Sequence, residues 1–321
     1  MSITIAKTSI DPVIRPATEL HRPPEQPPRP HSRPSGGKRP DDSLSTLWAV
    51  HPTPIYENLP RDKSGPWFQF HMPSTFEWNR VKLPVPNLPR GLEGFRILHV
   101  ADFHMRRLWK PVYDKLLARI AASPPDLLLC SGDFVEDRRD HLPALPMVKR
   151  LVEGFRGRLG CYSVLGNHDL HRMEKPLRDS RVKLIENQRL EFEVNGATVD
   201  LIGLPGVDRR EFDESFVRSI PRRRERSLRI VLAHFPDQLK RTQFDLQQDL
   251  HLAGHTHGGQ CCLPGGFPIL RHDSLPRRLC SGIHWVDRTW LVVNRGFGFS
   301  GAPIRLFCPA EVLDLRLTRM T

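Results

Sequence analysis

The residues best suited to chemistry in this chain are carboxylates and histidines that follow short apolar runs. Five such runs end in polar side chains: FRILHVADFH (95–104), DLLLCSGD (126–133), CYSVLGNHD (161–169), RIVLAHFPD (229–237) and HLAGHTHGG (251–259). This pattern is typical of a buried strand whose carboxyl end delivers side chains into a site. The run ends contain Asp102, His104, Asp133, Asn167, His168, Asp169, His234, His255 and His257. They predict one polar site built from five strands.

The mixture of carboxylate and imidazole in this set indicates a metal site. It suits a pair of divalent ions of intermediate hardness, such as manganese, iron or zinc, because calcium prefers oxygen ligands alone. Two ions about 3.5 to 4 Å apart can hold the attacking and leaving oxygens of a displacement at phosphorus. The neighbouring glycines, Gly132, Gly166 and Gly254, allow sharp turns and leave room for ions and phosphate. We expect two divalent metal ions as cofactors, manganese before the others.

The same residues resemble a known family. ADFH, SGD, GNHD, the histidine of AHFPD, and GHTH resemble, in order, the five motifs of the calcineurin-like metallophosphoesterase superfamily. The resemblance covers residues 90–320 and is closer to a bacterial phosphodiesterase branch whose last motif continues as GHTHGGQ, and whose end carries segments similar to 295–298, 303–305 and 309–315 here. That branch includes membrane-associated phosphodiesterases and UDP-diacylglucosamine pyrophosphohydrolases of lipid A synthesis. The resemblance implies a four-layer αββα sandwich of two mixed β-sheets, and a metal-bridging hydroxide that attacks phosphorus.

The resemblance also implies a role for each motif residue. His168 would lie near the scissile phosphate, where it stabilises charge or protonates the leaving oxygen, and Asp169 would orient its ring. Arg106, just past the first motif, is expected to contact an anionic group of the substrate. The metal ligands would form two triads and one bridge: Asp102, His104 and His257 for the first ion, Asn167, His234 and His255 for the second, and Asp133 between them.

Composition divides the chain into three parts. Residues 1–45 are predicted to be a disordered proline-rich tail, with seven prolines in the twenty residues 21–40. Residues 46–90 are expected to pack on the outside of the core, with a strand at 76–85, and residues 91–321 to form the metallophosphoesterase domain. Helical stretches at 110–123 and 145–157 separate some of the five strands, so the class is α/β. Alternating runs at 190–204, 290–298 and 310–317 suggest hairpins and a second sheet.

Charge and hydropathy limit which partners the protein can bind and where in the cell it is expected. The formal net charge of +12 attracts anions in general, including nucleic acids, nucleotides and phospholipid head groups. The first residues lack the apolar core of an export signal, and no run of eighteen apolar residues occurs. We therefore expect a cytoplasmic protein that can associate peripherally with the inner membrane surface. The six cysteines show no CxxC spacing, which argues against a disulfide framework.

The segment CCLPGGFPILRHDSLPRRL (261–279) bears on the substrate, because an apolar loop followed by arginines suits an acyl chain with an anionic head. An ordinary lid packed on the core is the other interpretation. We expect a lipid-linked or nucleotide phosphoester, with UDP-diacylglucosamine as a candidate. A nuclease is the alternative, although no aromatic and basic interleaving or nucleic-acid module is apparent. A non-enzymatic scaffold of the same fold is disfavoured because His168 and every expected ligand are present.

Overall fold

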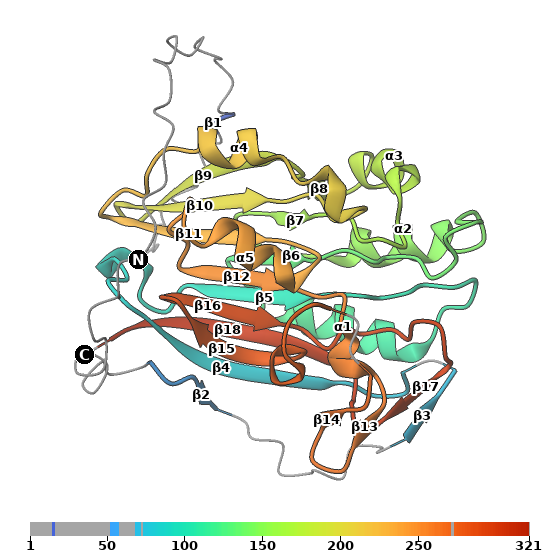
Figure 1. Ribbon diagram of the computed structural model, residues 1–321. Helices are drawn as coiled ribbons and strands as arrows, with labels where there is room; N and C mark the ends of the chain where they lie inside the picture. Colours follow the sequence, from blue (N-terminus) through green and yellow to red (C-terminus); the bar gives the residue numbers. More distant parts are fainter. Residues whose placement is uncertain (1–14, 17–51, 58–67, 72, 271–272, 321) are drawn as a thin grey trace, which may run out of the picture.

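Two seven-stranded β-sheets packed face to face form the centre of the molecule (Figure 1). The computed structural model describes residues 15–16, 52–57, 68–71, 73–270 and 273–320. Nearly all of the predicted tail at 1–45 lies outside these residues, so its disorder and the boundaries at 45 and 90 stay predictions. None of the helices in the described part of the chain is long and apolar enough to cross a bilayer.

Each sheet is mixed, with a parallel group of strands that is extended by antiparallel neighbours. The first sheet has the order β1 (Arg15–Pro16), β9 (Gln188–Val194), β10 (Ala197–Gly203), β11 (Ser227–Leu232), β12 (Leu250–Ala253), β16 (Thr289–Val293) and β15 (Gly282–Val286). The second has the order β2 (Ile55–Tyr56), β4 (Glu77–Val85), β18 (Glu311–Arg319), β5 (Arg96–Val100), β6 (Leu127–Cys130), β7 (Cys161–Ser163) and β8 (Val182–Leu184).

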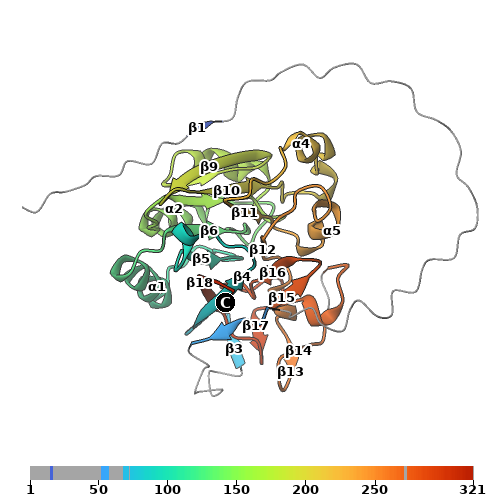
Figure 2. The same ribbon diagram turned by 90° about the vertical axis from the view of Figure 1, so that its left-hand side faces the viewer.

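Alternation along the strands creates the layers. On β6, Leu127 and Leu129 face the core between the sheets, while Leu128 and Cys130 face a second core on the outer side. Helices α1 (Pro111–Ala122), α2 (Leu145–Gly154) and α3 (Glu174–Arg178) contribute to that outer core. Helices α4 (Glu214–Ser219) and α5 (Leu239–Thr242) cover the outer face of the first sheet. The predicted four-layer αββα sandwich is confirmed, as the layers in Figures 1 and 2 illustrate.

The segment before residue 90 is more deeply integrated than an outer covering. Its strand β4 is hydrogen-bonded between β2 and β18, and nine consecutive residue pairs connect β4 to β18 in parallel. The runs at 290–298 and 310–317 contain β16 and β18, which lie in different sheets and do not form a hairpin. Because β4 and β18 are more than two hundred residues apart, their pairing could not be predicted from the sequence.

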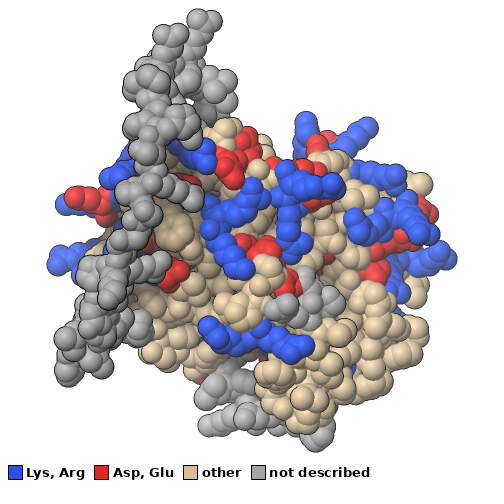
Figure 3. All heavy atoms as spheres, in the orientation of Figure 1, with Lys and Arg blue, Asp and Glu red and all other residues tan. Residues whose placement is uncertain are grey.

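Two small two-stranded units project from one end of the sandwich: β3 (Phe68–Phe70) with β17 (Ile304–Leu306), and β13 (Cys262–Leu263) with β14 (Phe267–Pro268). Figures 1 and 2 both show these four strands close together, apart from the main helices. Lysine and arginine side chains are spread over much of the face in Figure 3, but its lower right part, over β13 and β14, has none.

A buried ion pair connects two strands of the first sheet, and its removal should weaken the fold. Arg229 on β11 donates from Nε to Asp200 Oδ2 on β10 at 2.7 Å, and both side chains are almost fully buried. In Asp200→Ala the guanidinium would stay buried without its carboxylate, so we expect a loss of about 3–5 kcal/mol in the free energy of unfolding. Urea unfolding of the purified protein measures this. Glu214→Ala, which breaks exposed pairs with Arg218 and Arg241, should leave the urea midpoint unchanged.

Candidate active site

The predicted site residues meet where the carboxyl ends of strands from both sheets converge. Strands β5, β6 and β7 are parallel neighbours in the second sheet, and β11 and β12 are parallel neighbours in the first. Each strand ends two to six residues before the side chains it carries into the site. Most of these side chains are buried, whereas Asn167, His168 and His255 are half-buried and line a cavity of about 350 Å³. This cavity is the catalytic pocket below.

The backbone at the site adopts a conformation that side chains normally avoid. Five of the seven expected metal ligands have positive φ, from 44° to 69°. A non-glycine residue in this region costs about 1–3 kcal/mol, and such residues concentrate at functional sites. Hydrogen bonds hold the turns: the His255 N–H donates to Asp102 Oδ1 at 2.9 Å, and the His168 N–H donates to Asp133 Oδ1 at 2.7 Å. The five turned residues are Asp102, His104, Asp133, His255 and His257.

The first expected ligand triad forms a compact cluster. His104 Nε2 and His257 Nε2 are 2.9 Å apart, and His257 Nε2 is 4.0 Å from Asp102 Oδ1. The ligand atoms of these three residues lie within 4.8 Å of one another. The two imidazole nitrogens and the carboxylate therefore face one common point.

The second triad is gathered around an amide oxygen. Asn167 Oδ1 is 2.9 Å from His234 Nε2 and 3.0 Å from His255 Nδ1. Asp133 stands between the triads, because its Oδ2 is 3.4 Å from His104 Nε2 and 3.5 Å from His234 Nε2. The structure thus groups the seven residues as two triads and a shared carboxylate.

These residues fit a pair of divalent ions. Ligand atoms about 2.1 Å from one ion lie about 3 Å from each other, which is close to the separations between the imidazole nitrogens and oxygens here. Burial and the neighbouring charge of Asp133 raise the pKa of the Asp102 carboxyl well above its ordinary value. A cation between the two carboxylates would remove that cost and favour their charged forms. Oxygen and imidazole together suit manganese, iron or zinc, and do not single out one of them.

Residues outside the motifs orient the expected ligands. The Glu136 carboxylate contacts His104 Nδ1 at 2.6 Å and accepts the Gly301 N–H at 2.9 Å. The carbonyl oxygen of Ser131 lies 2.7 Å from His234 Nδ1. In each case a partner fixes one ring nitrogen and leaves Nε2 directed toward the triads. Sequence reasoning assigned no role to Glu136, although it follows Asp133 by three residues in GDFVED.

Arg305, which lies after the last motif in the chain, contacts His257 and the loop beside it. Its guanidinium is almost fully buried and donates to the carbonyl oxygens of Arg295, Gly298 and Cys308 at 2.7 to 3.2 Å. The Nη2 atom also lies 3.1 Å from His257 Nδ1. The sequence pointed to segment 303–305 only through its resemblance to the family. In the structure, Arg305 of this segment holds the 295–298 loop against His257.

His168 is oriented by a different partner from the one predicted. Its Nδ1 lies 2.7 Å from the carbonyl oxygen of Glu136, whereas no hydrogen bond in the described part of the chain joins Asp169 to the imidazole. The Asp169 carboxylate instead accepts the N–H groups of Phe134, Val135 and Gly166 at 2.6 to 3.2 Å. The prediction that Asp169 orients His168 is therefore wrong in its contact. Asp169 fixes the two loops that carry Asp133 and His168.

Two further histidines within the motif strands have no place in the site. His99 on β5 and His251 on β12 are completely buried, and burial lowers the pKa of each imidazole to about 3. They are neutral packing residues.

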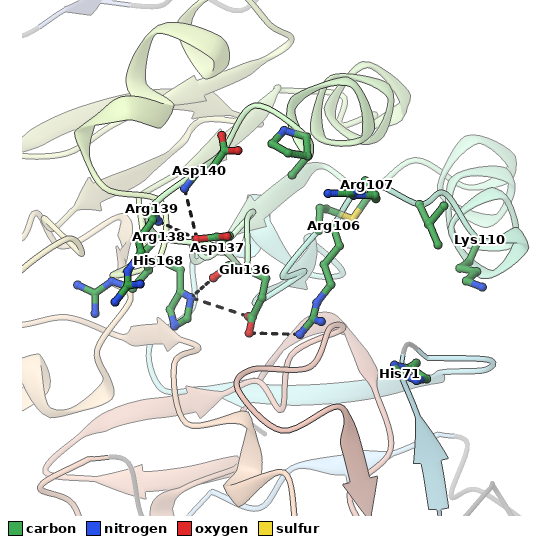
Figure 4. A pocket seen from close by; sticks show the side chains of 14 residues that line it. His71, Arg106, Arg107, Lys110, Glu136, Asp137, Arg138, Arg139, Asp140 and His168 are labelled. Carbon is green, nitrogen blue, oxygen red and sulfur yellow. Dashed lines mark hydrogen bonds and ion pairs between the residues drawn. The ribbon is translucent and has the colours of Figure 1, made fainter.

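A second, larger cavity of about 960 Å³ adjoins the catalytic pocket, and we call it the basic pocket (Figure 4). His168 lines both cavities. Arg106 lies here, 3.4 Å from Glu136 Oε1, with its side chain partly exposed. The predicted anion-contacting residue is therefore close to His168. The cations that line the basic pocket are Arg106, Arg107, Lys110, Arg138, Arg139 and, when protonated, His71.

Comparison with known proteins places this site in a family. The family model described as calcineurin-like phosphoesterase matches residues 95–259. An uncharacterized metallophosphoesterase of Campylobacter jejuni is 28% identical over 254 residues, which are 76% of this chain and 63% of that protein. The uncharacterized metallophosphoesterase YkoQ of Bacillus subtilis is 25% identical over 224 residues, 67% of this chain and 81% of that protein.

A further relative is named for an enzymatic activity. The UDP-2,3-diacylglucosamine pyrophosphatase LpxG of Chlamydia muridarum is 23% identical over 314 residues, which are 78% of this chain and 92% of that protein. The chain spans less than two thirds of the Campylobacter relative. These similarities show that the proteins are related, but they do not identify a substrate. Because the family model covers more than half of the 321 residues and includes all nine motif residues, the chain belongs to the calcineurin-like phosphoesterase family, the metallophosphoesterases that the sequence predicted.

Proposed function

We propose that this protein hydrolyses phosphodiester or pyrophosphate bonds in a lipid-linked or nucleotide substrate, with two divalent metal ions. The observation that carries the proposal is the shared position of Asp133 between two ligand triads, with His168 beside them in the same pocket. When bound, two divalent ions would polarise the phosphoryl group and lower the pKa of water that attacks it. Asp102, His104 and His257 would hold one ion, and Asn167, His234 and His255 the other, with Asp133 as bridge.

His168 is the residue we assign to proton transfer or charge stabilisation. A carbonyl oxygen only accepts hydrogen bonds, so the contact with the Glu136 carbonyl requires the proton on Nδ1. The Nε2 atom is then the one that can exchange a proton with a leaving oxygen or donate to a phosphoryl oxygen. His168 is also the residue common to the two cavities, which suits a group at the scissile bond.

The basic pocket supports a substrate with a second anionic group next to the phosphoester. Among the described residues, no carboxylate forms an ion pair with the side chains of Arg107, Lys110, Arg138 or Arg139. The acids of this pocket have other partners. Asp137 accepts the N–H groups of Arg139 and Asp140, and Asp140 accepts the N–H of Leu142. Four cations without an ion-pair partner in the pocket of His168 suit a diphosphate, and the activity for which the Chlamydia relative is named makes UDP-diacylglucosamine the first compound to test.

Hydrolysis should depend on metal. Purified protein supplied with manganese should hydrolyse bis-p-nitrophenyl phosphate, and EDTA should abolish this activity until excess manganese is restored. Release of nitrophenolate measures the rate, and elemental analysis of the active protein measures the bound metal. Asp133→Asn prepared in parallel controls for a contaminating phosphatase. Full activity in protein that contains no transition metal would contradict the proposed function.

Substitution of His168 should separate chemistry from metal binding. His168→Ala should retain its metal content yet lose about 10²–10⁴-fold in kcat, because a positioned proton donor contributes on that scale. Asp133→Asn should lose both metal and activity. His171→Ala is a matched control, because that exposed histidine is held by Glu174 and Glu211 and should keep its normal rate. Unchanged kcat in His168→Ala would remove the residue from the reaction.

The cations of the basic pocket should matter for substrates with two phosphates. Arg138→Ala with Arg139→Ala should lower kcat/KM for UDP-diacylglucosamine by about tenfold or more, since each hydrogen bond to a charged group contributes about 1.5–3 kcal/mol. Hydrolysis of bis-p-nitrophenyl phosphate should change much less. Arg222→Ala with Arg226→Ala, an exposed pair between α4 and β11, is the matched control. Preferred cleavage of single-stranded DNA that falls steeply with salt would favour the nuclease instead.

A further inference from the structure

Large exposed apolar side chains are concentrated at one end of the molecule. Among the described residues ten such side chains are exposed, and six of them lie on β3, on the β13–β14 hairpin and just after it. These two segments are almost two hundred residues apart in the chain. The six residues are Phe68, Phe70, Leu263, Phe267, Ile269 and Leu270, and we call them the apolar surface.

Strand pairing makes this surface continuous. Strand β17 pairs with β3, so that Leu306 lies opposite Phe68 and Ile304 lies opposite Phe70. Gln69 and Arg305, between them, are turned inward and buried, which leaves the outer face of this ribbon entirely apolar. On its other side Leu306 is bridged to Cys261, and Cys261 leads directly into β13. Figures 1 and 2 both show β3, β17, β13 and β14 together.

The surface begins at the catalytic pocket. Leu270 is more than half exposed and also lines that pocket, together with His168 and His255. The Ile269 N–H donates to the Cys261 carbonyl at 3.1 Å and holds the end of the hairpin in place. An acyl chain attached to a phosphoester in the pocket could therefore leave along Leu270.

Charge distinguishes between the partners that an apolar surface could bind. The strands β3, β13, β14 and β17 contain no acidic residue. Arg277 and Arg278 lie beside the hairpin, with Arg277 Nη2 3.5 Å from the Ile269 carbonyl, and both are exposed. On the other side, His71 directly follows Phe70 and lines the basic pocket. A second copy of a chain with a net charge of +12 would be repelled, whereas an anionic surface would be attracted.

We propose that the apolar surface docks the protein on an anionic phospholipid bilayer and opens the catalytic pocket toward a lipid-linked substrate. The aromatic and aliphatic side chains would enter the headgroup boundary, while the flanking arginines contact lipid phosphates. The bare tan region over β13 and β14 in Figure 3, with basic side chains above it, has this arrangement. The delivery of substrate rests on the proposed function, whereas the docking does not.

Vesicle flotation of the full chain, without any substrate, tests the docking. The natural protein should float with vesicles of phosphatidylcholine mixed with phosphatidylglycerol, and much less with phosphatidylcholine alone. Leu263→Ser with Phe267→Ser should weaken partitioning by about tenfold or more, because two large apolar side chains no longer leave water. Phe68→Ser with Phe70→Ser tests the same surface from an independent strand. The control is Phe244→Ser, which alters a side chain that is 81% exposed and lies two residues after α5, a helix away from the hairpin.

The outcomes separate this inference from the proposed function. Equal partitioning of the natural protein and both double variants, or no partitioning of any, overturns the docking. A dimer that forms without vesicles and is lost in the double variants would assign the surface to a second copy and also overturn it. Vesicle binding that follows the predicted order supports the docking even if bis-p-nitrophenyl phosphate is not hydrolysed, in which case only the proposed function fails. Unfolding midpoints of the variants, compared with that of Phe244→Ser, confirm that they are folded.

Discussion

Two carboxylates, Asp102 and Asp133, are buried together where the two sheets meet, and the rest of the site is arranged around them. A buried charge without a partner is among the costliest features that a fold can contain. The neighbours of Asp133 reduce this cost: although burial acts to raise its pKa, the charges of His234 and His104 hold it below the ordinary value. Asp102 has less compensation, so it is the residue with most to gain from a bound cation.

The same requirement explains the strained turns and the small residues beside them. To bring both carboxylates and the imidazoles within a few ångströms, the chain must turn sharply after each strand, and five of the ligands adopt positive φ. Gly166 and Gly254 make the close approach feasible. A Cβ atom at Gly254 would lie 2.5 Å from Asp102 Oδ2, and one at Gly166 would collide with Asp133 Oδ1. The strain is held by the packed sheets, because the buried cores on both faces fix where each strand ends.

The sequence was sufficient to predict which residues meet, because each follows a buried parallel strand and such strands end at one edge. It was not sufficient to predict which atom orients which ring. His168 is held by the backbone carbonyl of Glu136, and a carbonyl has no signature in the sequence. Asp169, adjacent to His168 in the chain, instead binds three backbone N–H groups. The pairing of β4 with β18 was equally invisible, since it depends on contacts across more than two hundred residues.

The net charge of +12 does not by itself distinguish a nucleic acid from an anionic lipid as the partner. The positions of the cations and of the apolar surface favour the lipid. Cations without carboxylate partners lie on one side of His168, in the basic pocket, and the apolar surface begins on the other side at Leu270. A nucleic acid would use the cations and leave the apolar side chains in water. A lipid with a phosphorylated head uses both, because its phosphates meet the arginines while its acyl chains leave along the hairpin. The two surfaces share one pocket, so a substrate that occupies both must place its phosphoester beside His168.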